Sequence, residues 1–382
     1  MRVARLLASP RPPRCLGLLA GLAAALAVPG LAWAGADDPA VWVDRMNQVL
    51  ANRNYDGVFV HQLGEHRETL RIIHRVQDGH LTERLVSTDG SGREFVRDGN
   101  ELVGYFPDRR IVVVEKRTRS LGFIGGLPGF DPGAQANYDV RDVEHSRVLG
   151  RATRVITVTP RDNYRYGYRL WIDEKTAMPV KTQLASASGE IIEQITFASL
   201  SMPSRIEEEL LKPEVETEGF RWLRREPPVF KPGEQVAWSA QSLPPGFRRS
   251  AGGVSGMPGP PKPASHMVFT DGLASVSVFI ETAATPVQLT RKGTPRQAQG
   301  AAQLGAAAAF TALTEGYRVT AVGEVPPATV KAIAESLRPI QEADPRLSDA
   351  PVAADRSAAD ARVLRGLGAP TVAPLDRNAL RP

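Results

Sequence analysis

The stretch Tyr55–Lys116 reads YDGVFVHQLGEHRETLRIIHRVQDGHLTERLVSTDGSGREFVRDGNELVGYFPDRRIVVVEK, and its pattern decides the fold. Apolar and polar side chains alternate along it with a period of two, which is typical of strands that bury one face. Short turns such as Gln77-Asp78-Gly79 and Asp98-Gly99-Asn100 separate the runs, and turns this short join only antiparallel neighbours. The stretch therefore predicts a meander. Its strands are expected at Tyr55–Leu63, Thr69–Val76, Leu81–Ser87, Phe95–Arg97, Glu101–Phe106 and Ile111–Lys116.

One helix precedes this meander, and more strands follow it. Asp37-Asp38-Pro39 offers an N-cap and a first-turn proline, after which apolar side chains recur at helical spacing through Asn52. Beyond a glycine-rich loop at Leu121–Pro132, further strands are expected at Tyr138–Glu144, Ala152–Thr159, Tyr168–Asp173, Val180–Leu184 and Glu190–Ser199. We therefore predict a mainly β protein with helices (α+β), whose first domain is a curved antiparallel half-barrel sheet around a helix.

Composition divides the chain into five segments. Residues 1–34 read as a signal peptide, 35–205 as the first domain and 206–219 as an acidic linker, exposed, with one helical turn at its start. Residues 220–340 form a smaller β-rich second domain, and residues 341–382, which lack aromatic residues and periodicity, a disordered tail. The second domain is expected to have strands at Gln235–Ala240, Met267–Thr270, Ser275–Glu281 and Tyr317–Gly323, and a helix from Pro326 through Leu337.

The first 34 residues have the order of an export signal. Four arginines and no acid accompany an apolar run at Cys15–Val28, and Ala32-Trp33-Ala34 offers a cleavage site. The run has 14 residues, whereas a bilayer span needs roughly 20, so a retained membrane anchor is the weaker interpretation. Cleavage after Ala34 would also remove the single cysteine, which excludes a disulfide and a thiol nucleophile.

Without the signal peptide, the chain has 43 basic and 42 acidic side chains and is close to neutral. Nucleic-acid binding, which usually needs a concentrated basic surface, is therefore not expected. The charge is nevertheless uneven along the chain: net 0 over residues 35–205, −5 over 206–219, +6 over 220–340 and 0 in the tail. The near-neutral whole thus conceals a basic second domain.

The sequence offers no pattern that would support catalysis or a cofactor. The glycines at 122–129 lack the spacing of a nucleotide loop, and Gly253-Val254-Ser255-Gly256-Met257 breaks the serine-hydrolase pattern at its last position. The six histidines are scattered without metal-ligand spacing, and the spacing of the acids selects no glycosidase pair. We expect no enzyme activity, no metal and no cofactor.

Two blocks of sequence carry a family resemblance. The first is YDGVFV at Tyr55 with ETLRI, ERL and RE-x-x-R downstream, and the second is LPPGF at Leu243, FTDGLASVSVFIE at Phe269 and VTAVGEVPPATVKAIAESL at Val319. Over residues 40–340 the chain resembles the MucB/RseB family of periplasmic regulators in Gram-negative envelopes. The loop at 252–263, the alanine run at 306–309 and the tail after residue 340 depart from the family pattern.

The resemblance implies a fold and a role. The first domain is expected to be similar to LolA/LolB lipoprotein carriers. The role is negative regulation of an envelope-stress sigma factor in the periplasm: the protein would bind the periplasmic part of a membrane anti-sigma factor, protect it from proteolysis and release it on lipid or lipopolysaccharide signals. The resemblance does not fix the oligomeric state, so a homo-oligomer is one of the alternatives. The alternative is a periplasmic lipid or lipoprotein carrier, since a half-open sheet around a helix can bury an acyl chain.

Two sets of residues are candidates for these contacts. Arginines next to an aromatic residue are typical of protein interfaces; the partner-binding candidates are Arg221, Trp222, Arg224, Arg225, Arg248 and Arg249. The same arginines could instead be solvated or pair with the linker glutamates. Apolar side chains that face the inside of the sheet or stand in the glycine-rich loop are candidates for lipid sensing, or they simply close the core. They are Leu70, Ile72, Phe123, Ile124, Leu127 and Phe130, and alternation also puts Tyr168, Leu170 and Ile172 on an inward face.

Overall fold

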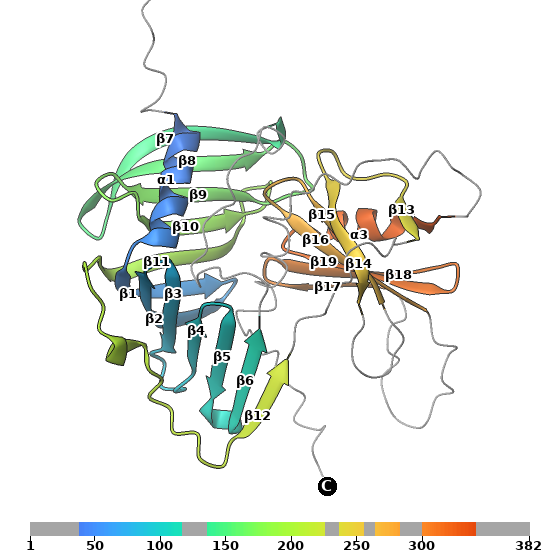
Figure 1. Ribbon diagram of the computed structural model, residues 1–382. Helices are drawn as coiled ribbons and strands as arrows, with labels where there is room; N and C mark the ends of the chain where they lie inside the picture. Colours follow the sequence, from blue (N-terminus) through green and yellow to red (C-terminus); the bar gives the residue numbers. More distant parts are fainter. Residues whose placement is uncertain (1–37, 117–135, 226–236, 256–263, 283–299, 341–382) are drawn as a thin grey trace, which may run out of the picture. The chain divides into compact units, whose positions relative to one another are not determined.

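The structure is a computed structural model, and it describes residues 38–116, 136–225, 237–255, 264–282 and 300–340. The expected signal peptide, the glycine-rich loop at Leu121–Pro132 and the tail lie outside these residues. Two β-sheets dominate the described part of the chain (Figure 1). No helix among the described residues is long and apolar enough to cross a membrane.

The first sheet has twelve strands in the order β12-β6-β5-β4-β3-β2-β1-β11-β10-β9-β8-β7. Their bounds are β1 Tyr55–Leu63, β2 His66–Gln77, β3 His80–Ser87, β4 Glu94–Asp98, β5 Glu101–Phe106, β6 Ile111–Lys116, β7 Tyr138–Val148, β8 Arg151–Pro160, β9 Gly167–Asp173, β10 Pro179–Ala185, β11 Ile191–Ser201 and β12 Arg221–Arg225. All neighbours pair antiparallel except β12 and β6, which are parallel. The predicted meander is therefore confirmed as β1–β6, and the curved antiparallel sheet is confirmed as well.

The predicted N-terminal helix is α1, Pro39–Asn52. The Asp38 side chain accepts a hydrogen bond from the Ala40 amide at 2.9 Å, and Pro39 occupies the first turn, so the sequence signals for the helix start act as expected. Figure 1 shows α1 lying across strands of the first sheet. The apolar face of the helix packs into one core with the inward side chains of the strands. That core includes Trp42, Val43, Met46, Leu50, Phe59, Leu70, Ile72, Leu170 and Ile172, with Tyr168 partly buried against it.

A glycine lets β1 and β11 approach each other closely. A Cβ on Gly57 would stand 2.7 Å from the Phe197 ring and 2.7 Å from the Ser199 carbonyl oxygen. Cβ atoms in proteins do not come this close to other heavy atoms. The strand register shifts at Val58/Phe59, next to this contact. The glycine of the YDGVFV block is therefore required by packing.

The acidic segment 206–219 lies against the first sheet. Its glutamates are exposed, but Ile206 and Leu211 are buried against Ile73, so the expectation of an exposed linker is wrong for its apolar side chains. The expected helical turn is the 3₁₀ helix η2, Glu208–Leu211. Further along, Val215 and Phe220 pack on the cluster of Tyr105, Val112 and Val114. Apolar residues spaced among the glutamates thus hold the segment to the sheet, and β12 then pairs with β6.

The second sheet has six antiparallel strands in the order β14-β15-β16-β19-β18-β17. Their bounds are β14 Arg248–Ser255, β15 Ala264–Thr270, β16 Ser275–Thr282, β17 Gly300–Leu304, β18 Ala307–Thr314 and β19 Tyr317–Gly323. Helix α3, Pro327–Ser336, packs on β18 and β19, and β13, Trp238–Ala240, pairs with β20, Leu337–Pro339. The alanine run enters this core: Ala308 is buried together with Ala312 of the same strand and with Val330 and Ile333 of the helix. Small side chains there let α3 lie close to the sheet.

Candidate functional site

The aromatic and basic residues at 221–225 form β12, the last strand at one edge of the twelve-stranded sheet (Figure 1). Among the described strands, β12 is hydrogen-bonded to β6 alone. Trp222 stands beside Val112 in the register and is 49% exposed, and Arg221 and Arg224 are exposed. A sheet edge that no other described strand covers, with an exposed indole and guanidinium groups, is a suitable surface for a protein partner.

The remaining two partner-binding candidates belong to the other sheet. Arg248 and Arg249 begin β14, which is an edge strand of the six-stranded sheet, and both side chains are exposed. The structure therefore distributes the six candidates over two edge strands in two sheets. The physical reason is the parallel pairing of β12 with β6, which assigns residues 221–225 to the first sheet.

The lipid-sensing candidates fall into two groups. Leu70 is 6% exposed and Ile72 is fully buried, and both belong to the core that α1 covers. Phe123, Ile124, Leu127 and Phe130 lie outside the described residues.

A row of polar side chains crosses the face of the sheet that holds Leu70 and Ile72. Tyr55 pairs with His74, His74 with Glu83 and Glu83 with Arg97 on successive strands, and all four side chains are buried. His74 Nδ1 lies 2.6 Å from Glu83 Oε1, Arg97 Nε lies 3.5 Å from Glu83 Oε2, and the Tyr55 ring stacks on the imidazole at 4.2 Å. Burial, with Glu83 nearby, raises the pKa of Tyr55 well above its usual value. The buried His74 imidazole is thus held between the Tyr55 ring and the Glu83 carboxylate.

A buried ion pair joins the two sheets. Arg165 follows β8 in the chain and Asp271 stands in the turn between β15 and β16, yet Arg165 Nη1 donates to Asp271 Oδ2 at 2.7 Å, with both side chains 0% exposed. Arg165 also donates to Asp162 at 2.9 Å and to the Pro245 carbonyl oxygen, and the Tyr138 hydroxyl donates to Asp271 at 3.0 Å. A charge without exposure is tolerated only when it is paired in this way.

The turn that contains Asp271 is shaped by the same carboxylate. Asp271 Oδ1 accepts the backbone N–H groups of Leu273 at 2.9 Å and Ala274 at 2.6 Å. Leu273, 1% exposed, is thereby presented to the α1 core of the first sheet. A second contact adds to the junction, where the Thr329 hydroxyl donates to the Tyr164 carbonyl oxygen at 2.6 Å.

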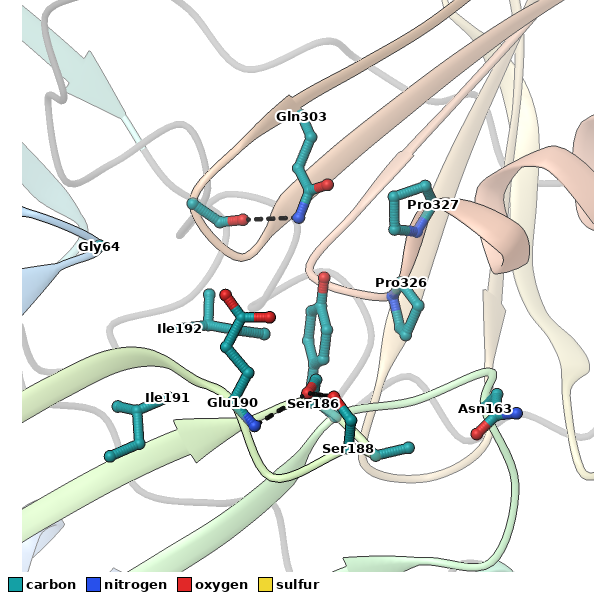
Figure 2. Close-up of a pocket in the computed structure, with 13 residues that line it drawn as sticks. Gly64, Asn163, Ser186, Ser188, Glu190, Ile191, Ile192, Gln303, Pro326 and Pro327 are labelled. Carbon is teal, nitrogen blue, oxygen red and sulfur yellow. Dashed lines mark hydrogen bonds between the residues drawn. The ribbon is translucent and has the colours of Figure 1, made fainter.

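A pocket of about 480 Å³ opens at the junction (Figure 2). Its described lining comes from the hairpin turns at Gly64 and Ser186–Ile192, from Asn163 and Tyr166, and from Gln303, Gly305, Pro326 and Pro327. Figure 2 shows Glu190 and the Ser186–Ser188 pair below Gln303 and the two prolines. The serine hydroxyls are 2.8 Å apart, and Ser186 Oγ accepts the Glu190 amide at 3.1 Å.

Tyr166 is the buried polar residue of this pocket. It is 5% exposed, and its hydroxyl has no hydrogen-bond partner among the described residues. Burial and the nearby Glu324 carboxylate raise the pKa of Tyr166 to about 12, so the hydroxyl stays protonated at neutral pH. Elsewhere in the described ranges, no group of three or more His, Cys, Asp or Glu side chains could hold a metal ion.

Comparison with known proteins supports the family suggested by the two sequence blocks. The MucB/RseB N-terminal domain matches residues 38–215, and the MucB/RseB C-terminal domain matches residues 232–338. The chain belongs to the MucB/RseB family. The sigma factor AlgU regulatory protein MucB of Pseudomonas aeruginosa is 33% identical over 340 residues, which cover 85% of this chain and 98% of the relative. The sigma-E factor regulatory protein RseB of Escherichia coli K12 is 26% identical over 308 residues, 78% of this chain and 89% of the relative.

Solved structures of MucB are similar to this MucB/RseB protein in fold. The complex structure of Pseudomonas aeruginosa MucA/MucB has a TM-score of 0.58 at 30% identity, covering 80% of this chain and 99% of that chain. A crystal structure of MucB in complex with MucA(peri) has the same TM-score at 29% identity, covering 80% and 100%. The regions matched by the two family models contain the two large sheets apart from β12, and the small β13–β20 sheet apart from the end of β20.

Sequence reasoning missed the junction of this MucB/RseB protein. Arg165, Asp271 and Tyr166 were not candidates, because the partners of the ion pair are 106 residues apart and no spacing rule connects them. One local signal was present. The Thr270-Asp271-Gly272 sequence is typical of a turn in which the aspartate caps its own backbone, and the structure has this turn.

Proposed function

We propose that this protein is a periplasmic negative regulator of an envelope-stress sigma factor, which binds the periplasmic part of a membrane-bound anti-sigma factor. The observation that carries the proposal is the match over both domains to MucB, which has been solved in complex with MucA(peri). The relatives are named as regulatory proteins of sigma factors. In the same proposal the protein has no enzymatic activity and acts by shielding its partner from proteolysis.

The two edge strands supply the proposed partner contacts. Arg221, Trp222 and Arg224 on β12 are exposed, and so are Arg248 and Arg249 on β14. Edge strands can accept an extended segment of a partner as an additional strand, and arginines favour an acidic one. For Arg225 the strand position alone supports the assignment. A partner segment with several Asp or Glu residues fits this surface best.

Lipid or lipopolysaccharide signals are proposed to release the partner through the first domain. Leu70 and Ile72 lie in the core between the curved sheet and α1, which is where an apolar ligand would have to enter. The glycine-rich loop with Phe123, Ile124, Leu127 and Phe130 is proposed to respond to such a ligand.

The rival function, a lipid or lipoprotein carrier, is favoured by the same curved sheet around α1. Deleting residues 220–382 would not separate the two functions cleanly, because it would also remove β12 from the first sheet and Leu273 from the α1 core. Variants of the full mature chain are therefore the better test.

The test is capture of the partner from detergent-solubilised envelope by the full mature chain, with the bound protein identified. We expect a membrane protein with an acidic periplasmic segment, bound more weakly as salt rises. The double change Arg221→Glu with Arg224→Glu should reduce capture, and so should Arg248→Glu with Arg249→Glu. The matched control is Arg141→Glu with Arg147→Glu on β7, two exposed arginines at the opposite edge of the first sheet. Capture that all three pairs reduce equally, or that none reduces, would contradict the assigned surface.

A further inference from the structure

The pocket in Figure 2 has no role in the contacts proposed so far, and its charge is of one sign. Among the described lining residues, Glu190 is the single carboxylate, and none is Lys, Arg or His. A hollow with a carboxylate and no cation disfavours phosphate and carboxylate ligands and favours a positive one. The exposed Glu190 stands at the pocket beside the Ser186–Ser188 hydroxyl pair, so hydrogen-bond acceptors lie next to the charge.

Apart from Asn163, Tyr166 and Gln303, the rest of the described lining is apolar. Ile192, Pro326 and Pro327 contribute aliphatic surface to its walls. One of the large apolar side chains that the fold leaves exposed lines the pocket, namely Ile191, 48% exposed. A second, Leu304, 52% exposed, stands in the chain between the lining residues Gln303 and Gly305. Exposed apolar side chains that gather at a hollow mark a binding surface more often than scattered ones do.

Tyr166 adds an independent sign that the pocket is built to hold a ligand. Buried hydroxyl groups are nearly always hydrogen-bonded, and a buried group without a partner destabilises the fold. The Tyr166 hydroxyl has no partner among the described residues, although the Ser186 and Ser188 hydroxyls of the same pocket are hydrogen-bonded to each other. A ligand that brings a hydrogen-bonding group to the Tyr166 hydroxyl would remove this cost.

We propose that this pocket binds an alkylammonium or guanidinium group on an aliphatic stem, namely a Lys or Arg side chain of the protein partner. The stem packs on Ile192, Pro326 and the rim residues, as long basic side chains do on apolar surfaces. The charged head reaches the Glu190 carboxylate and the neighbouring hydroxyls. Because Glu190 belongs to the first domain and Gln303 and Pro326 to the second, the bound side chain contacts both domains.

That the bound group belongs to the protein partner rests on the proposed function. The kind of group that the pocket binds does not. A free polyamine carries the same group on the same kind of stem as a lysine of the partner. The experiment therefore has a small-molecule arm, which tests the pocket alone, and a partner arm, which tests the source.

In the first arm, N-acetyl-lysine methylamide is titrated into the full mature protein while the backbone amide resonances of Gly64 and Gly305 are followed by NMR. N-acetyl-norleucine methylamide and N-acetyl-glutamate methylamide are the matched probes without the cation and with the opposite charge. We expect saturable shifts with the lysine probe and weak or no shifts with the other two. Glu190→Gln should lower the affinity about fivefold, as expected for one partly exposed ion pair. Glu315→Gln, an exposed glutamate in the turn after β18, is the control and should have no effect.

Tyr166→Phe removes the buried hydroxyl and nothing else. This change should lower the affinity for the lysine probe. It should leave the melting temperature unchanged or raise it, because the hydroxyl has no partner to lose among the described residues. Equal binding of the lysine and glutamate probes, or lysine binding that is indifferent to both Glu190→Gln and Tyr166→Phe, would overturn the proposal whether or not the partner is ever captured.

In the second arm, capture of the partner is compared for Glu190→Gln and Leu304→Ser, with Leu313→Ser as the control for an equally exposed leucine of the same sheet. Reduced capture by the first two and normal capture by the third supports a partner side chain as the ligand. If the lysine probe binds as expected but capture is unaffected, and cadaverine binds more tightly than the capped lysine, then the partner is overturned as the source and a free diamine takes its place.

Discussion

Replacing Arg165 by Met removes the cation that faces the buried carboxylate of Asp271 and leaves the carboxylate in place. Met retains most of the volume of the arginine stem, so the change concerns the charge more than the packing. Asp271 would keep three neutral donors: the Tyr138 hydroxyl at 3.0 Å and the amides of Leu273 and Ala274 at 2.9 and 2.6 Å. These donors reduce the destabilisation caused by the loss of the guanidinium, but they do not replace its positive charge.

The expected destabilisation follows from the burial of the pair. Both side chains are 0% exposed, and removal of one partner of a fully buried pair costs about 3–5 kcal/mol. For a protein of this size the melting temperature should fall by roughly 10 °C. Arg141→Met is the matched control, because Arg141 pairs with Asp139 at 2.5 Å but is 70% exposed, and an exposed pair contributes little to stability.

The assay is urea unfolding of the mature chain combined with hydrogen exchange of the Leu273 amide, which Asp271 holds. The double variant Arg165→Met with Asp271→Asn should be less unstable than the sum of the single variants by about 2 kcal/mol, since it leaves no unpaired buried charge. If Arg165→Met costs no more than Arg141→Met, or if the two single changes are additive, the pair is not desolvated and the reasoning fails.

Three further expectations concern other parts of the chain. His74→Leu leaves the Glu83 carboxylate buried without its imidazole at 2.6 Å and should cost about 3 kcal/mol in urea unfolding, against less than about 1 kcal/mol for the exposed His145→Leu. Gly57→Ala should lower stability by about 1–3 kcal/mol because its Cβ would meet the Phe197 ring and the Ser199 carbonyl oxygen at 2.7 Å, and the double variant Gly57→Ala with Phe197→Leu should cost less than the sum of the two single changes.

The third expectation concerns pH. Burial lowers the pKa of His266 to about 4, below the usual 6.5, so the unfolded state binds the proton more readily than the folded state between these two values. Stability should therefore fall as the pH drops from about 6.5 to about 4, by roughly 3 kcal/mol, and His266→Gln should flatten this part of the curve. An unchanged slope in the variant would assign the acid sensitivity to other groups.

The strands that could be predicted are those whose signals are local. The bounds of β1, β5 and β6 agree with the sequence pattern, because alternation and short polar turns act over a few residues. β12 could not be found in this way, because its partner β6 lies more than a hundred residues earlier and the pairing is parallel. β18 is rich in alanine, a poor strand former, and exists as a strand because its small side chains fit beneath α3.

The candidate site shows the same division. The exposed arginines and Trp222 were predicted because their residue types are typical of interfaces, whereas the junction depends on side chains that only the folded chain brings together. Among the residues of the pocket, Ser186 and Glu190 come from one hairpin and Gln303 from another, more than a hundred residues later. Neither hairpin has a feature that would distinguish it from an ordinary turn in the sequence.

Charge counted along the sequence describes surfaces only for side chains that the fold leaves exposed. The acidic segment has a net charge of −5, but Arg84 of β3 donates to Glu214 at 3.0 Å and to Glu94 at 2.8 Å, so part of that charge is neutralised by the first sheet. Arg165 counts toward the net charge of 0 over residues 35–205, but its side chain is fully buried and adds no charge to the surface. Arg221 and Arg224, by contrast, were counted with the second domain and are exposed on the first sheet. At the proposed interface a partner would therefore meet basic side chains on both sheets, and we expect its own charges to be spread over more than one segment.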